Sequence, residues 1–383
     1  MAIKRLIIVG DLFPVDSNMD LFYKGDVKQL FGEKICDLFA AADYRICNLE
    51  GALTDGKKRM MKTGPIITAP TKAVNAYKTL GIDYCMLANN HITDAGTEGV
   101  EQTIGALDRA GIQYIGAGLN ERSISHYVVL SLEGKTICIY NVSETMYNKP
   151  SALQAGAWLY DEYIVCKEIQ SLKSQYDHVV VIYHGGIEKF RYPSPETIKR
   201  FHRMADSGAD AVLSQHTHCI GCEEYYKGSY LLYGQGDFLF NNFRPGLTDT
   251  GIIVELVVEG DKLSWDKHMV ECSDKFHLRY VENPDFSEFK ERSSRLNDNT
   301  FVYSQFQEFC KKELRLYLTA FKSPGLTYRL FRKFFPKRFN KWLRSDAFHR
   351  KDLMFALHTL RSEQNRETAI VGIEQLIEGK ELS

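Results

Sequence analysis

The hydrophobic positions in the first two-thirds of the chain form short continuous runs, separated by polar turns and by stretches with helical spacing. The runs cover residues 6–9, 44–47, 84–88, 179–183 and 211–213. Continuous apolar runs of this length are typical of strands that are buried on both faces. Their alternation with helical stretches predicts a layered α/β domain.

The segments between these runs predict covering helices and two hairpins. Helical spacing occurs over residues 28–41, 72–80, 97–110 and 196–207. The pair Glu133-Gly134 divides residues 127–141, and Gly260-Asp261 divides residues 251–270. Such turn pairs between strand-like runs are typical of hairpins. We therefore expect antiparallel strands to be added to a mixed sheet.

The character of the sequence changes near residue 275, where the strand-like runs stop and helical patterns take over. We predict a main domain over residues 1–274 and a helical, basic and aromatic extension over 275–383. Residues 311–351 contain thirteen Lys or Arg against two acidic residues, interleaved with aromatic side chains. Either the extension packs its aromatic face on the main domain, or it makes peripheral contact with an anionic membrane.

Net charge and cysteine usage narrow the class of protein. The formal charge of -1 gives no basic excess, so we expect no nucleic-acid partner. The first apolar run is too short for a signal peptide or a membrane span. The nine scattered cysteines predict buried, reduced thiols. We expect a cytoplasmic protein, either free or peripheral at the inner membrane face.

Polar side chains with metal-binding chemistry follow the predicted strands, at the point where each strand ends. They are Asp11, Glu50, Asn90, His184, His216 and His218. Loops that leave the carboxyl ends of strands in such sheets converge on one edge. Carboxylate, amide and imidazole ligands suit Mn²⁺, Zn²⁺ or Fe²⁺. The pattern predicts two divalent ions, with Glu50 as the acid between them, and phosphoester hydrolysis as their chemistry.

Six short motifs occur in order between residues 4 and 270. They are Gly10-Asp11, Asn48-Leu49-Glu50, Ala88-Asn89-Asn90-His91 with Asp94 and Gly96, His184-Gly185-Gly186-Ile187-Glu188, His216-Thr217-His218, and Tyr233-Gly234-Gln235-Gly236-Asp237-Phe238. Together they resemble the CapA family, which is named for poly-γ-glutamate capsule synthesis and is related to the calcineurin-like metallophosphoesterases. The resemblance implies a four-layer α/β/β/α sandwich with a dinuclear metal centre.

The resemblance also implies a role for each matched residue. One metal would be held by Asp11 and His218, and Glu50 would bridge the two ions. The second metal would be held by Asn90, His184 and His216.

Three further residues receive catalytic roles from the same resemblance. His91 matches the histidine that protonates the leaving oxygen in the wider superfamily. Asp94 either orients that imidazole or caps the helix that follows it. Glu188 either fixes a ligand histidine or touches substrate.

Two positions depart from the pattern, and one pair of cysteines invites a separate interpretation. Phe13 stands where the general phosphoesterase pattern has a histidine. Asp237 stands where many family members carry asparagine, and it either adds charge beside the site or caps a turn. Cys219 and Cys222 form a lone Cys-x-x-Cys, which without a second pair is weak evidence for zinc or redox chemistry.

Two functions of different classes agree with these observations. The first is a metal-dependent phosphoester hydrolase linked to capsule, exopolysaccharide or poly-γ-glutamate biosynthesis, with a phosphoester or polymer-linked substrate. The second is a non-catalytic accessory protein of surface-polymer assembly that binds polymer or partner proteins. Loss of turnover on metal removal favours the hydrolase, and activity that survives metal removal favours the accessory protein.

Overall fold

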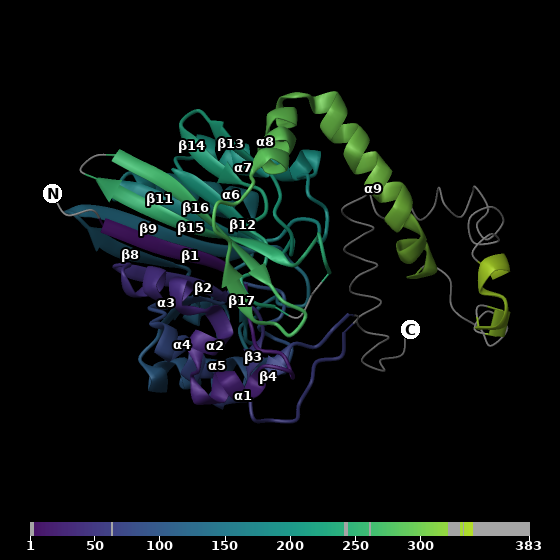
Figure 1. Cartoon of the computed structure of the whole chain (residues 1–383), viewed down its shortest axis with the longest axis horizontal. Helices are drawn as coiled ribbons and strands as arrows, with labels where there is room; N and C mark the ends of the chain where they lie inside the picture. Colours follow the sequence, from purple (N-terminus) through teal and green to yellow (C-terminus); the bar gives the residue numbers. More distant parts are fainter. Residues whose placement is uncertain are drawn as a thin grey trace. The chain divides into compact units, whose positions relative to one another are not determined.

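The computed structural model describes residues 4–320, apart from 63, 241–243 and 260–261, together with 330, 331 and 333–339. The chain divides into two compact units, Met1–Phe306 and Gln307–Ser383. All strands of the described residues lie in the first unit (Figure 1).

Seven of the described strands form the first sheet, in the order β17-β16-β15-β1-β2-β5-β6. Its parallel part consists of β1 (Lys4–Leu12), β2 (Tyr44–Leu49), β5 (Tyr84–Met86) and β6 (Gln113–Ile115). Its antiparallel part consists of β15 (Thr250–Glu259), β16 (Lys262–Cys272) and β17 (Leu278–Tyr280).

Six of the described strands form the second sheet, in the order β13-β14-β12-β11-β9-β8. They are β8 (Tyr127–Leu132), β9 (Lys135–Ser143), β11 (His178–His184), β12 (Ala211–Gln215), β13 (Glu223–Tyr226) and β14 (Ser229–Leu232). The hairpins β8–β9 and β15–β16 are confirmed. The expected turn at Gly260-Asp261 lies outside the described residues.

The two sheets pack face to face, and β1 shows why its apolar run is continuous. Leu6 and Ile8 belong to the core between the sheets, together with Ile182 of β11. Ile7 and Val9 belong to a separate core beneath the helices. Because alternate side chains of a strand point to opposite faces, burial of both faces requires an unbroken apolar run.

Helices cover both outer faces. The first sheet is covered by α1 (Met19–Lys24), α2 (Val27–Phe31), α3 (Glu33–Ala40), α4 (Val74–Leu80) and α5 (Gly96–Ala110). The second sheet is covered by α6 (Glu162–Lys173) and α7 (Pro195–Asp206). This is the predicted four-layer α/β/β/α sandwich (Figure 1).

Short elements complete the first unit. They are β3 (Ala52–Leu53), β4 (Thr68–Ala69), β7 (Ala117–Gly118), β10 (Gly156–Ala157), η1 (Thr71–Ala73), η2 (Glu121–Ser123), α8 (Ser287–Ser294), η3 (Arg295–Asn297) and the start of α9 (Asn299–Ala320).

Two helices differ from the sequence expectation. Residues 28–41 form α2 and α3 instead of one helix, because Gly32 between them has φ 77° and ends the first. Helix α6 was not expected, although Asp161 caps it by accepting a hydrogen bond from the Ile164 backbone.

The region after residue 275 is partly described. Strand β17 pairs with β16 there, and helices α8 and α9 follow. Most of the basic segment 311–351 lies outside the described residues, and so does the predicted membrane contact. None of the described helices has the length and apolar character needed to cross a membrane.

Candidate metal centre

The first sheet contributes two acids from the carboxyl ends of adjacent strands. Asp11 lies near the end of β1, after a shift in register with β2, and Glu50 directly follows β2. Residue 10 must be glycine, since a Cβ there would lie 2.3 Å from the carbonyl oxygen of Gly236. The close approach of Gly236 places another loop beside the acids.

The second sheet contributes three imidazoles. His184 is the last residue of β11, and His216 and His218 follow β12. His216 has φ 80° and His218 has φ 55°, a left-handed conformation that costs about 1–3 kcal/mol in a non-glycine residue. The backbone N–H of His216 donates to Oδ2 of Asp11 over 3.1 Å, which ties the two sheets together at the site.

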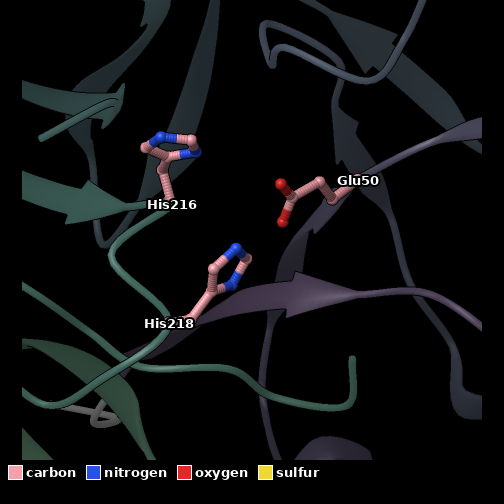
Figure 2. A group of neighbouring side chains, drawn as sticks. All are labelled: Glu50, His216 and His218. Atoms are coloured by element: carbon pink, nitrogen blue, oxygen red, sulfur yellow. The ribbon is translucent and has the colours of Figure 1, made fainter. Parts of the chain in front are cut away.

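Glu50 lies at the centre of the cluster. Figure 2 shows its carboxylate facing the imidazoles of His216 and His218. Its Oε1 is 3.5 Å from Nε2 of His184 and 3.9 Å from Nε2 of His91. Both carboxylate oxygens are buried and have no hydrogen-bond partner among the described residues. A buried carboxylate without a hydrogen-bond partner is a candidate ligand for a cation.

The potential ligand atoms form three groups, each within 4.8 Å. They are Glu50 with His216 and His218, Asp11 with Glu50 and His184, and Asp11 with His218 and Asp237. Asn90 joins them through Oδ1, which lies 2.8 Å from Nε2 of His184. The structure thus brings together all six residues that the sequence nominates and adds Asp237. Their roles as individual ligands stay a prediction.

Burial dominates the pKa shifts of Glu50, His184 and His216. Burial also acts to lower the pKa of His218, but Asp237 and Glu50 raise it well above its usual value overall. Burial raises the pKa of Glu50 well above its usual value, and the neighbouring Asp11 raises it further. Burial lowers the pKa values of His184 and His216, so their imidazoles stay neutral at pH 7. Neutral imidazole and carboxylate are the forms that bind metal. A divalent cation would supply the charge that a buried carboxylate needs, so the residues fit such an ion.

The Nε2 atom of His91 lies on the side of Glu50, and its Nδ1 atom contacts Asp94. Asp94 does not cap α5, whose N-cap is Ala95 without a side-chain hydrogen bond. Instead, Oδ2 of Asp94 lies 2.7 Å from Nδ1 of His91. Asp94 therefore contacts the imidazole instead of capping the helix, and its orienting role in catalysis stays a prediction.

Lys62 was not found by sequence reasoning. Its ammonium contacts Oδ1 of Asp94, lies 3.2 Å from Nδ1 of His91, and its side chain is 3% exposed. The backbone N–H of Ile67 donates to Oδ2 of Asp94, so the loop between β3 and β4 is anchored on this carboxylate. The loop has no periodic pattern, and nothing in its sequence signals the contact.

Asn48 and Glu144 were also missed. Nδ2 of Asn48 donates to Oδ1 of Asp11 over 2.7 Å and lies 3.1 Å from Nδ1 of His184. Glu144 follows β9, and its Oε1 is 3.6 Å from Nε2 of His216. The rule that selected the other acids, a polar residue directly after a strand, would also have selected Glu144.

Glu188 lies at the edge of the cluster. Its side chain is 45% exposed, forms an ion pair with Lys189 over 3.3 Å and belongs to none of the three ligand groups. Burial acts to raise its pKa, but His216 and His218 lower it overall. The histidines of the cluster thus affect the pKa of Glu188, although this residue belongs to none of the ligand groups. Its catalytic role stays a prediction.

Cys219 and Cys222 are buried free thiols. Burial raises the pKa of Cys219 to about 11 and that of Cys222 to about 12, so both stay protonated at neutral pH. Sγ of Cys222 donates to the carbonyl of Arg191. Protonated, buried thiols are poor metal ligands and poor nucleophiles.

A family model described as "Bacterial capsule synthesis protein PGA_cap" matches residues 5–242. The chain belongs to this family. The matched segment contains all seven side chains of the cluster, from Asp11 to Asp237.

Curated relatives carry related names. The chain is 29% identical over 221 residues to "Capsule biosynthesis protein CapA" of Bacillus anthracis, covering 55% of this chain and 54% of that protein. It is 29% identical over 211 residues to a "Probable polyglutamine synthesis accessory protein" of Mycobacterium tuberculosis, covering 51% and 55%. The match thus spans about half the length of both relatives. Among solved structures, a putative 5'-nucleotidase from Staphylococcus aureus aligns at 15% identity and TM-score 0.47, covering 78% of this chain and 58% of that chain.

Proposed function

We propose that this chain is a metal-dependent phosphoester hydrolase that serves capsule or poly-γ-glutamate biosynthesis. The observation that carries the proposal is Glu50, whose two carboxylate oxygens are buried without a hydrogen-bond partner in the described part of the chain. An unpaired buried carboxylate is costly, and such groups are kept where they bind cations or do chemistry. Histidines and a second acid surround this one.

The family resemblance would divide the ligands into two sets that share Glu50. Asp11 and His218 would hold one ion, and Asn90, His184 and His216 would hold the other. Mn²⁺, Zn²⁺ and Fe²⁺ suit this mixture of oxygen and nitrogen ligands. Two such ions would lower the pKa of a shared water and draw charge from the phosphoryl oxygens.

His91 would protonate the leaving oxygen of the ester. Its Nε2 is on the side of Glu50, whereas its Nδ1 is held by Asp94. Because Oδ2 of Asp94 is an acceptor, it fixes the proton on Nδ1 and leaves Nε2 to face substrate. As the imidazolium, His91 would carry a second proton on Nε2; transfer of that proton to the departing oxygen would return the ring to its neutral Nδ1–H form, a step worth about 10²–10⁴-fold in rate.

The test is metal content and phosphoester turnover of the same preparation. Protein purified without chelator is analysed by mass spectrometry and then assayed on bis(4-nitrophenyl) phosphate and 4-nitrophenyl phosphate, before and after metal stripping. We expect about two ions per chain and turnover that returns with metal. The His216→Ala variant should lose both bound metal and turnover. Unchanged turnover in His216→Ala or Asn90→Ala would contradict the proposal.

The second candidate function is an accessory protein that binds polymer or partner proteins without turnover. It is favoured by the name of the M. tuberculosis relative, which describes a synthesis accessory protein. In a producing strain that lacks this protein, an Asn90→Ala, His216→Ala double variant distinguishes the two functions. Polymer production restored by that variant supports the accessory function, and no restoration supports the hydrolase.

We also propose peripheral contact of the basic segment 311–351 with the inner membrane face. Its positive charge would meet anionic headgroups. Flotation of the full chain with vesicles containing phosphatidylserine tests this. Replacing the exposed Lys333, Lys337 and Arg338 by Gln should weaken binding. Equal binding of both proteins would reject the contact.

A further inference from the structure

Asp237 is the acid of the cluster to which the family resemblance assigns no role. It lies in the turn after β14, and its carboxylate is almost fully buried. Oδ1 is 2.7 Å from Nδ1 of His218. Oδ2 is buried and has no hydrogen-bond partner in the described residues. The other contact of Nδ1 is Oδ2 of Asp11, at 3.4 Å.

The turn that carries Asp237 is fixed to the first metal-binding strand. The backbone N–H groups of Phe238 and Leu239 both donate to the carbonyl oxygen of Asp11, over 3.0 and 2.9 Å. The ring of Phe240 stacks on His218 at 5.0 Å with an angle of 8° between the planes. His218 is therefore held at one edge by Asp237 and on one face by Phe240.

We propose that Asp237 is a positioning residue for the metal centre: it accepts the Nδ1–H of His218 and so presents the Nε2 lone pair to a divalent cation. With Nδ1 engaged by Asp237, Nε2 is the nitrogen left for coordination. Figure 2 shows a ring nitrogen of His218 directed toward the Glu50 carboxylate. The inference rests on the metal site of the proposed function and not on hydrolysis.

The distance between Oδ1 of Asp237 and Nδ1 of His218 distinguishes the positioning role from direct coordination of a metal by Asp237. Metal–oxygen and metal–nitrogen bonds of about 2.0–2.2 Å hold two adjacent ligand atoms about 3.4 Å apart around a tetrahedral ion and about 3.0 Å apart around an octahedral one. Oδ1 and Nδ1 are only 2.7 Å apart, which is a hydrogen-bond distance. The close pair is thus a carboxylate–histidine contact of the kind that orients metal ligands.

Asp237 also offsets the missing ligand at position 13. Phe13 is buried in the apolar core and offers no donor atom to the ion beside Asp11. A hydrogen-bonded carboxylate makes an imidazole more basic, and its negative charge favours a nearby cation. The side of the cluster that lacks the superfamily histidine therefore gains a third acid beside Asp11 and Glu50.

The experiment measures metal affinity directly. Metal-stripped protein is titrated calorimetrically with Zn²⁺ and with Mn²⁺ at pH 7.5, for wild type and for Asp237→Asn, which keeps shape and an acceptor oxygen but removes the charge. We expect one of the two ions to bind about 10–100-fold more weakly and the other to bind as in wild type.

The matched control is Asp249→Asn. Asp249 lies in the same segment, accepts a hydrogen bond from the Gly246 backbone and belongs to none of the ligand groups. The Asp249→Asn variant should bind both ions with the affinities of wild type. Equal weakening in both variants would mean a general charge effect and overturn the proposal, as would unchanged affinity in Asp237→Asn.

Two spectroscopic measurements complete the test. X-ray absorption of the Zn²⁺ form should give the same coordination number in wild type and Asp237→Asn, and a loss of one oxygen would make Asp237 a ligand instead. Nitrogen-15 NMR of the Zn²⁺-loaded wild type needs no variant and should find the single ring proton of His218 on Nδ1. A proton on Nε2 would overturn the proposal. Protein that binds metal as expected but cleaves no phosphoester would refute only the proposed function.

Discussion

The two ends of the parallel strands use acidic residues in opposite ways. At the amino ends of four described strands, an aspartate precedes the strand and accepts a backbone hydrogen bond from the neighbouring strand. The pairs are Asp43 with Arg5, Asp83 with Arg45, Asp177 with Thr136 and Asp210 with Val179. At the carboxyl ends, Glu50 and Asp237 have buried oxygens without a hydrogen-bond partner in the described residues.

The pKa values show the consequence. The Thr136 backbone N–H lowers the pKa of Asp177 to about 2. Burial raises the pKa of Asp237 to about 6 and that of Glu50 well above its usual value. A lowered carboxyl pKa stabilises the fold at pH 7, and a raised one destabilises it. The amino-end acids therefore stabilise the fold, whereas the carboxyl-end acids are the ones proposed to bind a cation.

Substitution of the shared acid should have the largest effect. Glu50→Gln should weaken the binding of both ions by more than the roughly 100-fold that loss of an outer partner causes. The unfolding free energy of the metal-free protein should not fall, because a neutral amide replaces a costly buried acid. Calorimetric titration and denaturant unfolding with chelator measure the two quantities. Retention of both ions, or a marked loss of stability, would contradict the comparison.

Lys62→Met should have the next largest effect, on catalysis. It leaves Asp94 without the ammonium on Oδ1, so His91 is held less well. We expect kcat to fall about 10–100-fold for an alkyl phosphate, which needs the acid, and much less for 4-nitrophenyl phosphate, which does not. Metal content should not change.

The matched control for this variant is Lys57→Met in the same loop, where the side chain is exposed. It should hydrolyse both substrates as wild type does. An equal loss of Lys62→Met activity on both substrates would show that Lys62 only supports the loop.

Asp210→Asn tests the opposite edge and should have a smaller effect. Asp210 accepts hydrogen bonds from Lys173 Nζ and from the Val179 backbone. Its loss should lower the unfolding free energy by about 1–2 kcal/mol at pH 7 and leave metal affinity unchanged. Asp206→Asn is the control and should be neutral, because it removes the exposed charge pair with Lys227 and keeps an acceptor oxygen for the Tyr226 hydroxyl. Altered metal affinity in Asp210→Asn would contradict the claim that the amino-end acids act on the fold alone.

The smallest expected effect is the pH dependence of the difference in unfolding free energy between wild type and Asp210→Asn. Burial acts to raise the pKa of Asp210, but His178, Lys173 and the Val179 N–H lower it overall. A depressed carboxyl pKa gives stability that is present above the unfolded value of 3.8 and is lost as pH falls through the folded value. The gap between wild type and Asp210→Asn should therefore narrow below about pH 4, as urea unfolding at several pH values will show. A gap that widens would contradict this sign.

The sequence alone determined the layered fold and most of the ligand cluster. Continuous apolar runs identify strands buried on both faces, and their carboxyl ends meet at one edge. Asp11, Glu50 and His184 could therefore be placed together without coordinates. The reason is local: a strand's pattern and the residue after it are read from a few neighbouring positions.

Only the tertiary structure decided which partners surround those ligands. Lys62 reaches Asp94 from a loop without periodicity, Glu144 follows a strand of the second sheet, and Asp237 meets His218 because its turn is bonded to Asp11. The contact of Asp94 with His91, in place of a helix cap, is likewise visible only in the tertiary structure. These contacts depend on loop paths and on the packing of one sheet against the other, and no short sequence pattern encodes either.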